Sequence, residues 1–285
     1  MSRRIGVAVL VLLGLFAAGL IVVWINRGRA TQDRTYCENN LRILAQAVEQ
    51  HGLTAPPAAV AGVAVPALNA RVPPGTVVNP ALPPESRLSW VVPLLPLFDQ
   101  RRQATASLFT QFDLAAAWDA EPGAAAARTR LSILTCLANP PEPTTGPALT
   151  QYIGAGGVGP DAASLPLSAE RWPPTAPPRA GCFRYDAPTP YASITDGLSH
   201  SVLFAEVSTD LGPWARGGRA TVRTLETGAR PPIGSGGQFG GNHPNGGNFA
   251  FADGSVRFLT DRTSPAVLEG LFTIAGGASD PLPGE

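Results

Sequence analysis

Residues 240–260 read GGNHPNGGNFAFADGSVRFLT, and this stretch decides how the rest of the chain is interpreted. Asp253-Gly254 lies between two short runs of residues that favour β-strands. Asp-Gly is typical of a two-residue hairpin turn, because such a turn takes positive φ at both central positions. Upstream, two glycine pairs bracket His243-Pro244, which predicts a loop. The stretch therefore predicts a glycine-rich loop followed by an antiparallel β-hairpin.

The register of this hairpin follows from placing Asp253 and Gly254 at the turn. Opposed residues of an antiparallel pair project from the same face. One face is then predicted to be apolar and to consist of Phe249, Phe251, Val256 and Phe258. The more polar face would carry Ala250, Ala252, Ser255 and Arg257. A slip by one residue would turn the phenylalanines to water, so we expect this register to be well determined.

Residues 5–25 form an uninterrupted apolar run, IGVAVLVLLGLFAAGLIVVWI. At about 1.5 Å per residue a helix of this length spans about 30 Å, which matches the hydrocarbon core of a bilayer. A secretory signal peptide is the main alternative. The run is longer than a typical signal core and no convincing cleavage site follows it, which favours a retained anchor. Arginines lie on both sides of the run, so they do not determine its orientation.

A helix is predicted to continue beyond the apolar run through residues 26–51. Leu41, Leu44 and Val48 recur at helical spacing, and no proline interrupts the segment. We therefore expect one long helix to run from the membrane into a soluble domain. Residues 52–85, by contrast, are rich in proline and alanine, and the prolines exclude a long helix. We interpret this segment as a loop on the domain surface.

Three later segments carry clear signals for single elements. Leu131, Ile133 and Thr135 alternate with Ser132 and Leu134, which predicts a strand ending at Cys136. Residues 201–207 are apolar on both faces, as is usual for a strand in the middle of a sheet. Near the C-terminus, Ser264 suits a helix cap, Pro265 the first helical position and Gly276 the stop.

The composition excludes several classes of function. The chain has 285 residues, is 44% hydrophobic and has a net charge of zero, which allows an ample core. All 21 basic residues are arginine and none forms a basic tract, so a nucleic-acid partner is not expected. No G-x-S-x-G hydrolase motif is present. The 31 glycines and 30 prolines favour a loop-rich fold that contains β-structure.

His243, nine further residues and then Asp253-Gly254 resemble the signature of the prepilin-type H-X9-DG family (domain of unknown function 1559). Four other segments are similar to family segments: CENNLRILAQAVEQHG at 37–52, SRLSWVVPLLPLFDQ at 86–100, FDLAAAWD at 112–119 and SITDGLSHSVLFAE at 193–206. The motif is long, so the resemblance is specific for a family. Family members usually begin with a type IV pilin-like helix, and their biochemical function is unknown.

The resemblance implies an α+β, pilin-like fold in which a long N-terminal transmembrane helix packs on an antiparallel sheet with Gly/Pro-rich loops. We expect five parts: a cytoplasmic tail (1–4), a transmembrane helix (5–25), its continuation (26–51), a Pro/Ala-rich segment (52–85) and an extracytoplasmic pilin-like domain (86–279). The implied location is the bacterial inner membrane, crossed once.

The N-terminus departs from the prepilin pattern in a way that bears on processing. Prepilins carry a cleavage glycine followed by phenylalanine, with a glutamate at the fifth position of the apolar run. Here Val7 follows Gly6, and Val11 stands at the position of the glutamate. We therefore expect a static membrane anchor rather than a processed filament subunit.

The resemblance also implies a disulfide between Cys37 and Cys136, the two cysteines at family positions. The protein has three cysteines and no C-x-x-C, so a zinc knuckle is not supported. A disulfide suits a domain outside the cytoplasm. Cys136–Cys182 is the rival pairing.

His243 and Asp253 are also candidates for an acid–base pair or a metal site. A strand over 248–252 would put the turn about 15 Å from the strand's start, with His243 before that start. We therefore expect structural roles, Asp253 in the turn and His243 bonding loop backbone. If a calcium or zinc ion binds, the candidate ligands are Asp196, Glu206, His243, Asp253 and Asp261, and the hard oxygen ligands of the aspartate-containing loops would suit Ca²⁺.

Together these observations predict a membrane-anchored, non-enzymatic, pseudopilin-like structural or interaction protein of the cell envelope or a secretion system. Its expected partners are the membrane, copies of itself, and secretion-system or pilus components. The alternative is an exported enzyme, or a carbohydrate- or metal-binding module, that uses the loop around His243.

Overall fold

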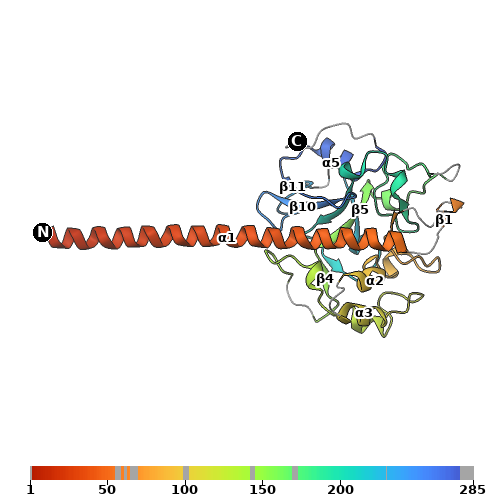
Figure 1. The fold of residues 1–285 in the computed structure, drawn as a ribbon, viewed down its shortest axis with the longest axis horizontal. Helices are drawn as coiled ribbons and strands as arrows, with labels where there is room; N and C mark the ends of the chain where they lie inside the picture. Colours follow the sequence, from red (N-terminus) through yellow and green to blue (C-terminus); the bar gives the residue numbers. More distant parts are fainter. Residues whose placement is uncertain are drawn as a thin grey trace.

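The computed structural model describes residues 2–54, 59–60, 63–64, 70–98, 103–141, 145–168, 173–228 and 230–276. A single helix, α1 (Ser2–Thr54), projects from a body of strands and irregular segments and then runs across that body (Figure 1). The body is built on a mixed, mostly antiparallel five-stranded sheet. The predicted α+β, pilin-like architecture is confirmed.

The sheet has the strand order β11-β10-β7-β5-β9. Its strands are β5 (Tyr152–Val158), β7 (Val202–Glu206), β9 (Val222–Leu225), β10 (Gly246–Phe251) and β11 (Val256–Thr260). Neighbours are antiparallel except β5 and β9, which run parallel. β7 is the middle strand, as predicted from its two apolar faces.

The predicted register of the β10–β11 hairpin is wrong by one residue. Phe249 pairs with Arg257 and Ala250 with Val256. The loop has three residues rather than two: the Gly254 amide donates to the Phe251 carbonyl (3.0 Å), and the Phe251 amide donates to the Ser255 carbonyl (2.9 Å). Gly254 supplies the left-handed φ of 82° that closes such a loop. Val256 and Phe258 consequently project from the face opposite Phe249 and Phe251.

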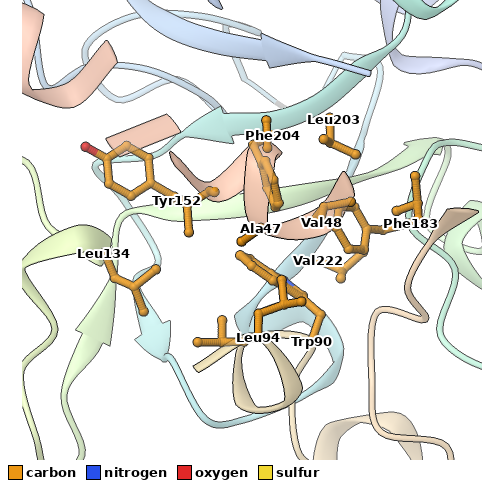
Figure 2. Packing of buried hydrophobic residues seen from close by; sticks show 14 of the residues in the cluster. Ala47, Val48, Trp90, Leu94, Leu134, Tyr152, Phe183, Leu203, Phe204 and Val222 are labelled. Carbon is orange, nitrogen blue, oxygen red and sulfur yellow. The ribbon is translucent and has the colours of Figure 1, made fainter. Parts of the chain in front are cut away.

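Both faces of the sheet are covered, because successive residues of a strand point to opposite sides. Tyr152 of β5 joins the core beneath α1, and its neighbour Ile153 joins the core beneath the C-terminal helix α5 (Pro265–Phe272). Figure 2 shows Trp90, Phe183 and Phe204 packed together, and the ring centroids of Trp90 and Phe204 are 4.8 Å apart. The outer half of α1 is therefore part of the core.

Two other element predictions need correction. Residues 131–135 do not form a strand but a 3₁₀ turn at Ser132–Leu134. Asn40 Nδ2 of α1 donates to the carbonyls of Ser132 and Thr135 (3.3 Å each), so these groups bind the helix instead of a neighbouring strand. Helix α5 is capped by Ser264, whose Oγ accepts from the Val267 amide (3.3 Å), but it ends at Phe272 rather than at the predicted stop.

Short elements complete the body. The helices are α2 (Val91–Leu94), α3 (Gln103–Phe109) and α4 (Gly123–Ala126). The strand pairs are β1 (Ala59–Val60) with β2 (Val63–Ala64), β3 (Arg71–Val72) with β6 (Thr189–Pro190), and β4 (Leu149–Thr150) with β8 (Gly212–Pro213). Residues 55–58, 61–62 and 65–69 of the predicted Pro/Ala-rich loop, and 277–279 of the predicted domain, lie outside the described residues.

Candidate functional site

Four side chains that can each donate an electron pair converge where α1 crosses the sheet. Cys37, Cys136, Glu206 and His243 each offer one atom, and these atoms all lie within 4.8 Å of one another. The first three residues are 0% exposed and His243 is 6% exposed. They come from four separate parts of the chain, so only the tertiary fold brings them together.

Cys37 and Cys136 meet because α1 packs against the segment that follows the 3₁₀ turn. Cys37 shares the buried face of α1 with Leu41 and Leu44, one and two turns further on. The amide of Cys136 donates to Gln151 Oε1 (2.7 Å), which fixes the backbone beside β5. The two Sγ atoms lie 2.7 Å apart.

The three cysteines are free, and no disulfide joins any cysteines of the described chain. The pair implied by the family resemblance, Cys37 and Cys136, is nevertheless the pair that the fold brings into contact. Cys182 is buried too, and desolvation alone raises its thiol pKa. It is not a member of the four-residue group.

Glu206 ends β7 and is fully buried. Its carboxylate accepts hydrogen bonds from the Asn248 backbone amide (2.8 Å) and from Asn248 Nδ2 (3.1 Å) on neighbouring β10. Oε1 lies 3.5 Å from His243 Nε2. A buried carboxylate is costly unless a cation or hydrogen-bond donors compensate its charge. These contacts hold the carboxylate in one orientation, facing His243.

His243 reaches Glu206 because the glycine-rich loop folds back over the end of β7. Gly240 and Gly241 take φ values of 71° and 83°, which residues with a side chain adopt rarely. The Gly240 amide donates to the Glu206 carbonyl (2.7 Å). Nε2 of His243 also lies 3.6 Å from Cys136 Sγ. The imidazole thus contacts both a carboxylate and a thiol.

The close packing shifts proton affinities within the group. The thiol of Cys136 beside Cys37 lowers the pKa of Cys37 to about 6, although burial acts in the opposite direction. Burial lowers the pKa of His243, but its contacts with Cys37 and Glu206 outweigh burial and raise that pKa to about 9. The geometry thus favours an imidazolium that faces a thiolate and a carboxylate.

The remaining candidate ligands lie elsewhere. Asp196 Oδ2 accepts from Thr273 Oγ1 (3.1 Å) and from the Gly276 amide (2.8 Å), where it holds the end of α5. Asp253 Oδ1 accepts from the Ser255 amide (2.9 Å) and Ser255 Oγ (2.7 Å) within the hairpin loop. Asp261 donates its amide to the Asn245 carbonyl. Of the proposed ligands, only Glu206 and His243 meet, and the two cysteines join them.

A groove leads from the surface to this group. It has a volume of about 340 Å³, lies between α1 and the glycine-rich loop, and His243 forms part of its lining. On the helix side it is lined by Arg34 and Glu38, which form an ion pair (2.9 Å). The Arg34 guanidinium lies 4.1 Å above the ring of Phe258, at the opposite wall. Solvent therefore reaches the edge of an otherwise buried cluster.

Comparison with known proteins gives one result at the level of a family. The model of a family described as "Protein of unknown function (DUF1559)" matches residues 28–229 and 215–266. These ranges include all four residues of the buried group. No curated protein and no solved structure matches the chain.

Proposed function

Because the chain belongs to the DUF1559 family, which is pilin-like and begins with an N-terminal apolar helix, we propose that it is a membrane-anchored, non-enzymatic structural or interaction protein of the pseudopilin-like type. Its soluble body would stand outside the cytoplasm of a bacterial cell, held by a single pass through the inner membrane. Its partners would be copies of itself or components of a secretion system or pilus.

The observation that carries this proposal is the contrast between the two halves of α1. Leu12, Phe16 and Trp24 are 65%, 67% and 78% exposed, whereas Leu41 and Leu44 further along the same helix are 0% exposed. Helix α1 contains a window long and apolar enough to cross a membrane, and none of that window is buried in the body. A continuous apolar surface of this size is unfavourable in water, and a bilayer would cover it.

A structural role also suits the buried group. Its donor atoms come from residues that are almost fully buried, which favours a group that holds the fold together over one that turns over a large substrate. The alternative, an exported enzyme or carbohydrate-binding module using the loop around His243, would need the loop to open.

The proposal includes a disulfide between Cys37 and Cys136 in the oxidising environment outside the cytoplasm. It would form by thiol–disulfide exchange with a protein disulfide donor: the two thiols lose two protons and two electrons, and the donor's disulfide is reduced to a dithiol. The 2.7 Å contact supports this pairing over Cys136–Cys182. Such a bond would tie α1 covalently to the body.

The proposal is tested by fractionating cells that express the full chain. We expect the protein in the inner-membrane fraction, resistant to carbonate extraction, with its body digested by protease added to spheroplasts. Leu13→Arg and Phe16→Arg together should release it from the membrane, because charges at the centre of a span are costly. Recovery of the unaltered chain in the soluble fraction, or of a body protected from external protease, would contradict it.

A further inference from the structure

We propose that Cys37, Cys136, Glu206 and His243, with both thiols reduced, form a site for a single zinc-class transition-metal ion. The site does not depend on the membrane anchoring proposed above. It combines two residues for which the family resemblance implies a disulfide with two that the sequence offered, together with aspartates, as ligands of calcium or zinc. The four donors meet only in the folded chain.

The chemistry of the donors selects the metal. Two sulfurs, one imidazole nitrogen and one carboxylate oxygen form a four-membered set of the kind that Zn²⁺ accepts in tetrahedral geometry. Ca²⁺ and Mg²⁺ require six or more oxygen ligands, whereas only Glu206 supplies oxygen here. Soft sulfur ligands favour Zn²⁺ and its neighbours among the transition metals.

The spacing is close to that of a tetrahedral site. Zinc–sulfur bonds of about 2.3 Å and zinc–nitrogen bonds of about 2.0 Å place ligand atoms about 3–4 Å apart. The contacts from His243 Nε2 to Cys136 Sγ (3.6 Å) and to Glu206 Oε1 (3.5 Å) already match this spacing. The two sulfurs, 2.7 Å apart, would need to separate by about 1 Å.

Supporting residues orient the donors as metal sites require. Asn248 holds Glu206 through two hydrogen bonds, and Gln151 fixes the Cys136 backbone. The Gln151 Nε2 group in turn donates to Asn242 Oδ1 (3.0 Å), the residue before His243. The groove beside His243 provides the path by which an ion would enter. Ligands, orientation and access are thus all present.

Metal binding releases protons to the buffer. Cys37 and Cys136 bind as thiolates and His243 as a neutral imidazole, so the protons that these three groups carry beforehand are released, and Zn²⁺ accepts an electron pair from each of the four donors. No electron is transferred. A disulfide between Cys37 and Cys136 removes both sulfurs as thiolates, so the oxidised pair and the metal site exclude each other.

The test uses the full chain in detergent under anaerobic conditions. Its cysteines are kept reduced by a phosphine, because a thiol reductant would itself bind the metal. Co²⁺ is added first, because thiolate ligation gives a sulfur-to-cobalt charge-transfer band and tetrahedral geometry gives intense visible absorption. We expect both, with one Co²⁺ per chain and complete displacement by Zn²⁺. A folded, fully reduced chain that shows no sulfur-to-cobalt band would overturn the proposal.

Substitutions distinguish metal binding at this site from binding at other cysteines and histidines of the chain. Cys37→Ser and Cys136→Ser should each weaken the charge-transfer band, and His243→Ala should lower Co²⁺ affinity by more than the roughly 10- to 100-fold that loss of a supporting outer residue typically costs. Cys182→Ser and His200→Gln are the matched controls and should leave spectrum and affinity unchanged. A band that persists in Cys37→Ser and Cys136→Ser but disappears in Cys182→Ser would place the metal elsewhere and contradict the proposal.

A measurement on the unaltered chain guards against variants that fail to fold. Excess Zn²⁺ should raise the melting temperature of the reduced chain, because an ion that binds only the folded state stabilises it by mass action. The rise should vanish after Cys37–Cys136 oxidation and return on reduction. An identical rise in both redox states would overturn the proposal, whereas fractionation and disulfide mapping test the proposed function independently.

Discussion

The Sγ atoms of Cys37 and Cys136 lie 2.7 Å apart although the two residues are 99 positions apart in the chain. One cysteine belongs to helix α1, which carries the exposed apolar run at its other end, and the other belongs to the sheet-bearing body. Any bond formed at this contact, covalent or through a metal, therefore connects α1 to the body.

For the oxidised protein, we expect Cys37→Ala to lower the free energy of unfolding by about 2–5 kcal/mol, the usual cost of losing a disulfide that closes a long loop. Peptide mapping without reductant should show Cys37 joined to Cys136 in the parent chain and in Cys182→Ala. A Cys136–Cys182 peptide would contradict this pairing.

We expect the buried carboxylate of Glu206 to contribute far more to the free energy of unfolding than an exposed carboxylate does. Glu206→Ala removes an acceptor for two hydrogen bonds from Asn248 and leaves those donors unsatisfied, so we expect about 2–4 kcal/mol of destabilisation in chemical denaturation. Glu226→Ala is the matched control. Glu226 pairs with Arg219 near the surface, and its loss should cost about 0–1 kcal/mol. Equal costs for both variants would show that Glu206 is not held as described.

We expect substitution of Gly254, in the three-residue hairpin loop, to lower the stability of the protein. Its φ is 82° and no atom crowds an added Cβ, so Gly254→Ala should cost about 1–2 kcal/mol through backbone conformation alone. Gly28→Ala has equally open space at an exposed helical position, and should be neutral or mildly stabilising to α1. Thermal melts of both variants in detergent compare the two effects.

We expect His51 to make the protein less stable at acidic pH. Burial, reinforced by the charge of Arg71, lowers the pKa of His51 below its ordinary value of 6.5. Its contribution to stability is therefore complete above pH 6.5 and is lost as the pH falls through the lowered pKa. Unfolding free energies of the parent chain should decline over this range more steeply than those of His51→Gln. Parallel pH profiles would count against the prediction.

Much of the fold was predictable from the sequence because strong local signals agree with the tertiary structure. The heptad-like spacing of Leu41, Leu44 and Val48 correctly marked the buried face of α1, and the doubly apolar run at 201–207 marked the middle strand. The hairpin was predicted in the right place, but its register was not. The predicted register requires that one face meets water, whereas both faces are packed, so a slip by one residue exposes no phenylalanine.

The candidate site was predictable only in pieces. The sequence pointed to Cys37 with Cys136, and separately to Glu206 with His243, but nothing in the local pattern connects the two pairs. The connection depends on the reversal at Gly240 and Gly241, which carries His243 back to the end of β7. An extended approach to the strand, from which the distance between His243 and the turn was predicted, does not contain this reversal.

In the proposed membrane-anchored form, the unbroken course of α1 sets how far the body stands from the lipid (Figure 1). Cys37 lies twelve positions beyond residue 25, the end of the apolar run, and at about 1.5 Å each these steps cover about 18 Å. Anchored in this way, the body would lie close to the bilayer at the end of a continuous helix. A tilt of the membrane-spanning part would then turn the whole sheet with it, and a partner protein would have to bind within this narrow layer above the headgroups.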